Sequence, residues 1–282
     1  MEKILVTGAT GQLGCELKSI HHSFKEYNWV FADRTQITLN NLNLLENQLK
    51  AIKPDIIINC GAYTAVDKAE IEQELANTIN HLSLERISNY SKENKVKLIH
   101  ISTDYVFEGT SNTPLNEESE TQPINSYGES KRLGELACLK NDPNSIIIRT
   151  SWMYSKFGSN FVKTMQKLMA DRDSISVVND QIGSPTYAAD LAEVIIKIVN
   201  TEKWSPGIYN YTNEGEISWF DFAVDIKEIT NSKCIILGIP TTEYPTPAKR
   251  PKYSLLDKSK IKHTFNIEIP NYKKRLKICL TS

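Results

Sequence analysis

Short apolar runs alternate with amphipathic segments through the first half of the chain. The runs are unbroken and rich in Ile, Leu and Val, which is typical of parallel strands that are buried on both faces. They stand at residues 3–7, 29–32, 55–59, 97–102 and 146–148. Apolar residues at helical spacing lie between them, around residues 16–20, 42–51 and 72–93. This alternation of strand and helix predicts a doubly wound parallel sheet, which is an α/β fold.

The pattern changes beyond Arg149. Short apolar runs, turns and Pro-rich stretches replace the regular alternation, at residues 175–178, 183–186, 208–211 and 244–251. We therefore expect a sheet domain over residues 1–150 and a smaller C-terminal substrate-binding domain over residues 151–282. The helix expected at residues 187–200 is long enough to return to the sheet domain.

The composition excludes several classes of function. The chain has 33 Lys and Arg against 34 Asp and Glu, so it offers no basic footprint for nucleic acid or an anionic membrane. No run approaches the ~18 apolar residues that span a bilayer, and the N-terminus lacks the pattern of a secretory signal. The five cysteines are scattered without Cys-x-x-Cys spacing, as expected of reduced thiols in a cytoplasmic protein.

A glycine-rich turn follows the first expected strand. Gly8 permits a tight turn, Gly11 lets the backbone approach a pyrophosphate, and Gly14 lets the next helix lie close to the strand. The N-terminus of that helix would face the anion. The turn predicts a dinucleotide-binding (Rossmann) domain. Its candidate cofactor-binding residues are Gly8, Thr10, Gly11, Gln12, Leu13 and Gly14.

Two further segments lie where this fold binds its cofactor. Asp33 and Arg34 end the second strand, where the fold places a residue that reads the ribose. Asp33 could accept from a free 2′-hydroxyl group and Arg34 could hold a 2′-phosphate, so NADH and NADPH both remain open. Ala62, Tyr63 and Thr64 follow the third strand and could form a wall for the cofactor, although a plain connecting loop would look similar.

The fourth expected strand and the helix after it carry a phenol, an amine and a hydroxyl group, on Tyr127, Lys131 and Thr103. Tyr127 and Lys131 are four residues apart, so they share a face of the predicted helix. Lys131 could lie beneath Tyr127 and lower its pKa from the usual value near ~10, which would make Tyr127 a proton donor near neutral pH. Thr103 follows the fourth strand at the same edge. The plain alternative is a packed ring beside a solvated amine.

These motifs resemble those of the extended short-chain dehydrogenase/reductases, and within them the dTDP-4-dehydrorhamnose reductase family. The resemblance covers nearly the whole chain. It is carried by the motifs at residues 8–14, 59–70, 102–109, 127–131, 149–152, 179–186 and 248–251.

The resemblance implies hydride transfer from NADPH or NADH to the C4 keto group of a nucleotide-linked 4-dehydro-6-deoxy sugar. The leading candidate is dTDP-4-dehydro-L-rhamnose, although reductases for other deoxysugars or deoxyheptoses would share these motifs. Tyr127 would protonate the developing alkoxide, and Lys131 would tune Tyr127 and hold the nicotinamide ribose. Thr103 would bond to the substrate oxygen, where new negative charge needs stabilising.

The same resemblance implies a set of substrate-binding residues. Trp152 would pack on the sugar, and Lys249 and Arg250 would meet the diphosphate, with Arg250 suited to bidentate contact. A core ring and a surface charge are the plain alternatives for Trp152 and Arg250. The full set is Thr64, Val66, Thr103, Asp104, Trp152, Lys249 and Arg250.

Two departures from the family pattern concern the adenine and a metal. Leu39 is counted among the cofactor-binding residues, but Thr38 precedes it where relatives usually have Asp. Some relatives bind magnesium at a dimer interface through carboxylates. Glu16 and Asp190 could supply two of these, but the C-terminal residues 280–282 offer no third. We expect no required metal, and a homodimer remains open.

Three other functions remain to be weighed. A dehydratase of the same superfamily would need Glu as a base after Asp104, where this chain has Tyr105. An epimerase would keep its NAD bound and return the hydride. A non-catalytic regulatory subunit, like that of methionine adenosyltransferase, would keep the fold without the chemistry.

Overall fold

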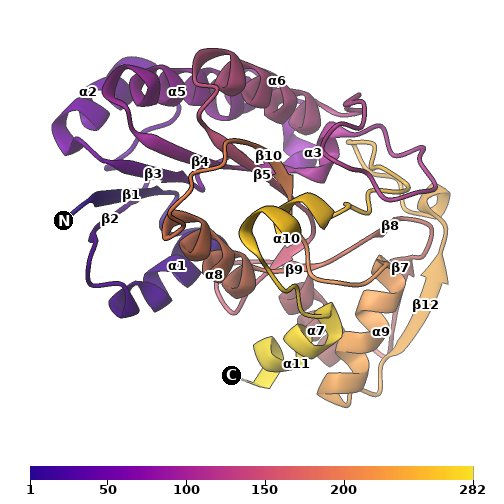
Figure 1. Cartoon of the computed structure of the whole chain (residues 1–282). Helices are drawn as coiled ribbons and strands as arrows, with labels where there is room; N and C mark the ends of the chain where they lie inside the picture. Colours follow the sequence, from indigo (N-terminus) through magenta and orange to yellow (C-terminus); the bar gives the residue numbers. More distant parts are fainter. Residues whose placement is uncertain (282) are drawn as a thin grey trace.

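The computed structural model describes residues 1–281, and its centre is a six-stranded sheet in which every pairing is parallel. The strand order is β10-β5-β4-β3-β1-β2 (Figure 1). The strands are β1 (Lys3–Thr7), β2 (Asn28–Ala32), β3 (Ile56–Asn59), β4 (Lys97–Thr103), β5 (Ile146–Thr150) and β10 (Gly207–Asn210). The predicted α/β fold with a doubly wound parallel sheet is confirmed.

Helices cover both faces of the sheet (Figure 1). Alternate strand residues point to opposite faces, so Leu5 and Ile57 join one apolar core while Val6 and Ile58 join the other. The first face is covered by α2 (Leu42–Ile52), α5 (Ser83–Asn94) and α6 (Ser126–Asn141), and the second by α1 (Gln12–Ile20) and α8 (Ala188–Val199).

The single helix expected over residues 72–93 is interrupted. It begins as α4 (Gln73–Asn77), widens into a π-helical turn over Thr78–Leu82, and continues as α5. The wide turn lies where the buried Asn80 uses its side chain to hold the backbone of Tyr63. Such turns are often found at functional sites, and periodicity alone does not reveal them.

The second half of the chain forms a smaller lobe and also returns to the sheet. The strand β10 extends the main sheet beside β5, so residues 207–210 lie in the sheet layer. The lobe has its own apolar core, with Phe222 and Leu276 fully buried. Its main elements are α7 (Phe161–Asp171), β7 (Ser174–Val178), α9 (Trp219–Thr230), β12 (Ile235–Ile239) and α11 (Tyr272–Thr281).

Shorter elements complete the chain. They are α3 (Val66–Ala69), β6 (Met153–Tyr154), β8 (Ile182–Gly183), β9 (Thr186–Tyr187), β11 (Ile217–Ser218), α10 (Ser259–Phe265) and the 3₁₀ turns His21–Ser23, Asp104–Val106 and Thr241–Glu243. Of these, α10 packs Ile261 and Phe265 against the sheet domain rather than the lobe.

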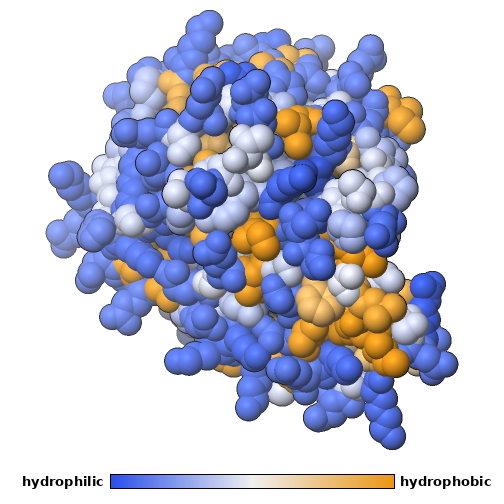
Figure 2. Space-filling view, turned by 90° about the vertical axis from the view of Figure 1, so that its right-hand side faces the viewer, coloured by the Kyte–Doolittle hydropathy of each residue, from blue (hydrophilic) through white to orange (hydrophobic). Residues whose placement is uncertain are grey.

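Polar residues cover most of the side of the molecule seen in Figure 2, and hydrophobic residues gather in its lower part. The strand β12 contributes to the exposed apolar surface through Ile235 and Leu237. Within residues 1–281, none of the helices has the length and apolar character needed to cross a lipid bilayer.

A buried ion pair joins α6 to the sheet. Arg149 of β5 donates from Nη2 to Glu135 Oε2 at 2.7 Å and from Nε to Glu135 Oε1 at 3.0 Å. Both side chains are only 3% exposed, and the guanidinium also lies over the ring of Phe107. Because each charge is removed from water, the pair is costly to break from one side.

We predict that Glu135→Gln lowers the free energy of unfolding by about 3–5 kcal/mol, because it leaves the Arg149 charge buried without a counter-charge. Urea unfolding followed by circular dichroism measures the change. Glu120→Gln, at an exposed position, serves as the control and should change stability by less than about 0.5 kcal/mol. Equal stability of the two variants would contradict the prediction.

Candidate active site

The carboxyl ends of the parallel strands form one edge of the sheet, and the order in which the chain adds strands reverses between β1 and β3. From this point the chain goes to β2 on one side and to β4 and β5 on the other. Ligands of open parallel sheets bind in the crevice at such a switch point. Four of the strands deliver segments to this edge. They are the glycine-rich turn after β1, the loop after β3, Thr103 at the end of β4 and the residues after Thr150 of β5.

The glycine-rich turn has the geometry needed to hold a dinucleotide. Gly8 has a φ of +63°, and a Cβ there would lie 2.7 Å from the backbone N of Gly61. A Cβ at Gly14 would lie 2.4 Å from Gly8 O, so α1 can approach β1 only with glycine here. The first turn of α1 has no side-chain cap and no acidic residue, so its N–H groups can receive a pyrophosphate.

Asp33 and Arg34 follow β2, and each has a distinct role in the structure. Asp33 Oδ1 accepts from the N and Oγ1 of Thr35, and these hydrogen bonds hold the pKa of Asp33 below its usual value. Its carboxylate thus organises the turn. The Arg34 side chain is exposed and makes no side-chain hydrogen bond within the described residues, so it remains available for an anion.

The remaining cofactor candidates line the loop after β3. The side chain of Leu39 packs on Gly61, where a Cβ would lie 2.7 Å from Leu39 Cδ1. Tyr63 is clamped by Asn80, which accepts from its N at 2.8 Å and donates to its O at 3.0 Å. Ala62 is partly buried and Thr64 is exposed beside them. Sequence reasoning missed Asn80, whose only signal was a polar residue on a buried helical face.

Tyr127 and Thr103 meet at this edge, although 24 residues separate them in the chain. Tyr127 lies in the first turn of α6, which Asn125 caps by accepting from Gly128 N at 2.7 Å. The Thr103 side chain lies beside the Tyr127 phenol, where hydrogen bonding from it lowers the pKa of Tyr127 against the effect of burial, and the Tyr127 ring packs edge-on against Tyr105. A single substrate oxygen can therefore lie within reach of both hydroxyl groups.

Asp104 is buried next to Thr103. It is 2% exposed, and its Oδ1 accepts from Thr103 Oγ1 at 3.1 Å. Burial raises the pKa of Asp104 to about 6, which hydrogen bonds from Ser254 and Thr103 partly oppose. The structure thus makes Asp104 a partner of Thr103, whereas direct contact with substrate stays a prediction.

The environment of Lys131 differs from the predicted one. Its Nζ donates to Ile101 O at 2.7 Å and lies 3.0 Å from His100 Nε2. Burial lowers the pKa of Lys131 to about 8 and raises the pKa of Tyr127 to about 12. The expectation that Lys131 lowers the Tyr127 pKa is therefore wrong for this arrangement, because desolvation of the phenol dominates and the carboxylate of Asp104 raises the pKa further.

Trp152 follows β5 and has a left-handed backbone with a φ of +47°. A bulky residue in this conformation is strained, and such strain concentrates at functional sites. Its ring is partly buried and stacks on Trp219 at 3.7 Å between centroids. Trp219, the first residue of α9, was missed from the sequence because a lone aromatic residue at a helix start is most often a core residue.

Arg250 links the lobe to the loop after β3. Its Nη1 and Nη2 donate to Asp67 Oδ1 at 3.1 Å and Oδ2 at 2.8 Å. Thr246 and Ala248 accept further bonds from Nη1, but Nε has no partner within the described residues. Lys249 is exposed beside it, with its O bound by Asn125. Val66, partly buried, begins α3 next to Asp67.

Comparison with known proteins agrees with this geometry. The sequence matches the RmlD substrate binding domain family over residues 1–282. It is 38% identical to the dTDP-4-dehydrorhamnose reductase of Aggregatibacter actinomycetemcomitans, over 98% of each chain. This chain belongs to the dTDP-4-dehydrorhamnose reductase family.

Two further comparisons show a similar likeness. The spore coat polysaccharide biosynthesis protein SpsK of Bacillus subtilis (strain 168) is 40% identical, over 91% of this chain and 89% of that one. The crystal structure of the dTDP-4-dehydrorhamnose reductase of Bacillus anthracis str. Ames in complex with NADP superposes with a TM-score of 0.94. It is 39% identical, over 99% of this chain and 98% of that one.

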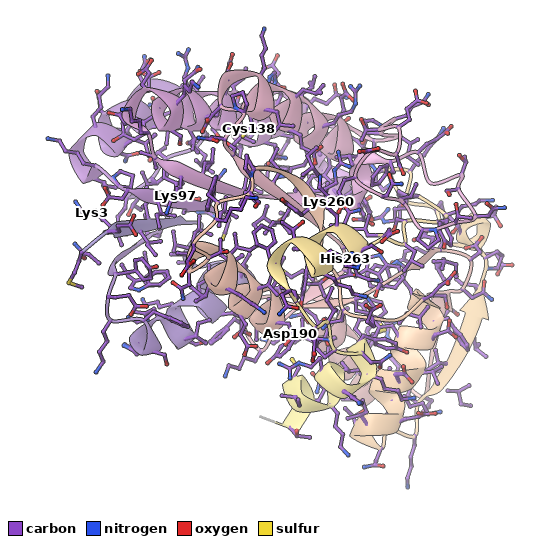
Figure 3. All side chains as sticks on the ribbon, viewed as in Figure 1. Lys3, Lys97, Cys138, Asp190, Lys260 and His263 are labelled. Atoms are coloured by element: carbon purple, nitrogen blue, oxygen red, sulfur yellow. The ribbon has the colours of Figure 1, made fainter. Side chains whose placement is uncertain are left out.

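The two carboxylates considered for a magnesium ion are both engaged within the chain. Asp190 pairs with the guanidinium of Arg275 and accepts from Asn213 Nδ2 at 2.6 Å, while Glu16 accepts from Ser155 Oγ at 2.6 Å. Figure 3 shows Asp190 on α8. Among residues 1–281 no group of three His, Cys, Asp or Glu side chains could hold a metal ion. Ser282 lies outside the described residues.

We predict that Asp67 and Arg250 stabilise this reductase together by about 1 kcal/mol or less, because Asp67 is partly exposed. A double-mutant cycle with Asp67→Asn and Arg250→Gln measures the coupling by urea unfolding. Arg250 holds the pKa of Asp67 below its usual value, so the coupling should persist at pH 5 and disappear as the pH falls through that lowered pKa. A coupling that grows on acidification would contradict this.

Proposed function

We propose that this protein reduces the C4 keto group of dTDP-4-dehydro-L-rhamnose with NAD(P)H, giving dTDP-L-rhamnose. The observation that supports the proposal is that Tyr127 and Thr103 lie side by side near the switch point, while Lys131 donates to Ile101 O of the strand that ends at Thr103. Relatives named as dTDP-4-dehydrorhamnose reductases match the chain over nearly its whole length. Family and site thus point to the same reaction.

The proton comes from the protein in this reaction. The bound nicotinamide supplies the hydride when NAD(P)H is in place. The substrate oxygen lies between the hydroxyl groups of Tyr127 and Thr103, and Tyr127 protonates it as negative charge develops. The raised pKa of Tyr127 keeps its proton in place at neutral pH, as a general acid requires. The ammonium form of Lys131 stabilises the phenolate that remains.

The cofactor and the substrate diphosphate bind to opposite sides of the crevice. The first turn of α1 receives the cofactor pyrophosphate, while Leu39, Ala62 and Tyr63 line the adenosine and nicotinamide side. Arg250 keeps its Nε free for the substrate diphosphate, and Lys249 adds an exposed charge. Trp152, stacked on Trp219, offers a flat face to the sugar.

The site argues against dehydration. A dehydratase needs a base at the position of Tyr105, but burial raises the pKa of that phenol well above its usual value. Tyr105 therefore stays protonated throughout the physiological range and cannot remove a proton beside the carbonyl. Reduction remains the reaction that uses the residues present. A cytoplasmic location and a homodimer stay predictions.

We predict that the protein oxidises NADPH in the presence of dTDP-4-dehydro-L-rhamnose, and that Tyr127→Phe lowers turnover by about 100- to 10,000-fold while cofactor affinity is retained. Loss of NADPH absorbance follows the reaction, and NMR identifies the product. Tyr154→Phe, which removes a buried hydroxyl group without a hydrogen-bond partner in the described structure, is the matched control. No turnover with any nucleotide-linked 4-keto sugar would overturn the function, and near-normal turnover of Tyr127→Phe would remove its acid role.

We predict that Arg34→Ala weakens NADPH binding about tenfold or more while it changes NADH binding little, because Arg34 is the exposed cation at the end of β2 that can hold a 2′-phosphate. Fluorescence titration of each reduced cofactor measures both dissociation constants. Lys25→Ala, which removes another exposed cation away from this loop, is the control. Equal losses for the two cofactors would discard the role of Arg34.

A further inference from the structure

A row of polar side chains crosses three neighbouring strands of the sheet, close to their carboxyl ends. Thr7 of β1 is in register with Asn59 of β3, which is in register with His100 of β4. Two residues earlier the same strands present Leu5, Ile57 and Leu98 to the same face, and those side chains form the apolar core beneath α5 and α6. The row therefore replaces three core positions with polar groups.

Continuous hydrogen bonds connect this row to Lys131. Thr7 Oγ1 accepts from Gly61 N at 3.2 Å and donates to Asn59 Oδ1 at 2.6 Å. Asn59 Nδ2 lies 2.9 Å from His100 Nδ1, and His100 Nε2 lies 3.0 Å from Lys131 Nζ. The three row side chains are at most 1% exposed. A buried polar network is costly unless each donor meets an acceptor, so its protons can be assigned.

The assignment starts from Thr7, whose hydroxyl group donates to Asn59 Oδ1. Asn59 therefore turns its Nδ2 donor toward His100, and His100 Nδ1 must accept. A neutral imidazole carries one proton, so that proton is on Nε2 and points at Lys131. An N–H group in this position is matched by the lone pair of an uncharged amine and not by an ammonium group. Burial and the neighbouring Lys131 lower the pKa of His100 well below its usual value, which keeps the ring neutral.

Few other ionisable groups face Lys131. Glu135 and Cys138 lie on its own helix, and Cys60 follows β3; each raises the Lys131 pKa slightly against the larger effect of burial. The carboxylate of Glu135 is already paired with Arg149. Because the pKa of Lys131 is lowered to about 8, both its charged and its uncharged form are accessible near neutral pH.

We propose that His100 is a positioning residue for the reduction. Its Nδ1 is held by Asn59, and its Nε2–H group points at Lys131. This contact favours the uncharged amine that Lys131 becomes when it has given a proton to the Tyr127 phenolate. This inference rests on the function proposed above. After Tyr127 has protonated the alkoxide, the ammonium form of Lys131 returns a proton to the phenolate. The uncharged amine then takes up a proton from water before the next turnover, so charge and protons balance over the cycle. Through Thr7, the row is also hydrogen-bonded to the backbone N of Gly61, against which the glycine-rich turn packs at Gly8.

Asn59→Asp tests the direction of the effect with almost no change in shape. A carboxylate offers only acceptors, so the proton of His100 must move to Nδ1 and Nε2 must accept from Lys131. This stabilises the ammonium form of Lys131. We predict that the basic limb of the pH profile of kcat/KM moves to higher pH by ~1 unit or more, at saturating NADPH.

The His100→Gln background separates this effect from a simple added charge. Without the imidazole, Asn59→Asp has no tautomer to reverse, so its shift of the basic limb should fall to less than half. An equal shift in both backgrounds would overturn the proposal. Leu98→Ala, a core truncation on the same strand and face, controls for lost stability and should leave the pH profile unchanged.

Two-bond ¹H–¹⁵N spectra of protein labelled at histidine give a readout that needs no sugar. The signal absent from His100→Gln identifies His100 among the five histidines. We predict the Nε2–H tautomer in the native protein and the Nδ1–H tautomer in Asn59→Asp. The Nδ1–H form in the native protein would overturn the proposal. Absence of turnover on every sugar, with the predicted tautomers present, would instead count against the reductase function alone.

Discussion

No side chain fits between the turn after β1 and the end of β3. A Cβ at Gly8 would lie 2.7 Å from Gly61 N, and a Cβ at Gly14 would lie 2.4 Å from Gly8 O. This close approach lets the N-terminus of α1 open onto the crevice at the switch point of the sheet. The cofactor site depends on it, because a wider turn would move the free N–H groups of α1 away from the edge where Thr103 and Tyr127 lie.

Lys131 is buried and Tyr127 is partly buried, and burial sets the protonation of both proposed catalytic groups. The pKa of Tyr127 rises to about 12 and the pKa of Lys131 falls to about 8, so burial shifts each group toward its uncharged form. A phenol that keeps its proton and an amine that can lose one are what proton delivery to a ketone requires. The polar row beneath Lys131 supplies hydrogen bonds that such burial would otherwise leave unmade.

The smaller lobe reaches the same crevice through two contacts of different kinds. Arg250 bonds to Asp67 across the gap between lobe and sheet, and Trp152 stacks on Trp219 of α9. The ion pair is partly exposed, whereas Trp152 holds a strained backbone conformation that its packing maintains. In the proposed mechanism, cofactor binding therefore depends on the sheet edge, and sugar binding depends on side chains that come mainly from the smaller lobe.

Much of this protein could be predicted from its sequence, because local patterns report local structure. Unbroken apolar runs showed the parallel strands, the glycine spacing showed the tight turn after β1, and the positions of Tyr127 and Lys131 placed both on one helix. Their environment was not visible in the same way, since desolvation depends on which elements pack together. The sign of the Tyr127 pKa shift, the pairing of Arg250 with Asp67 and the link from Lys131 to His100 all join residues distant in the chain. Such contacts arise only when strands and helices are brought side by side, and a pattern along one segment carries no record of its neighbours.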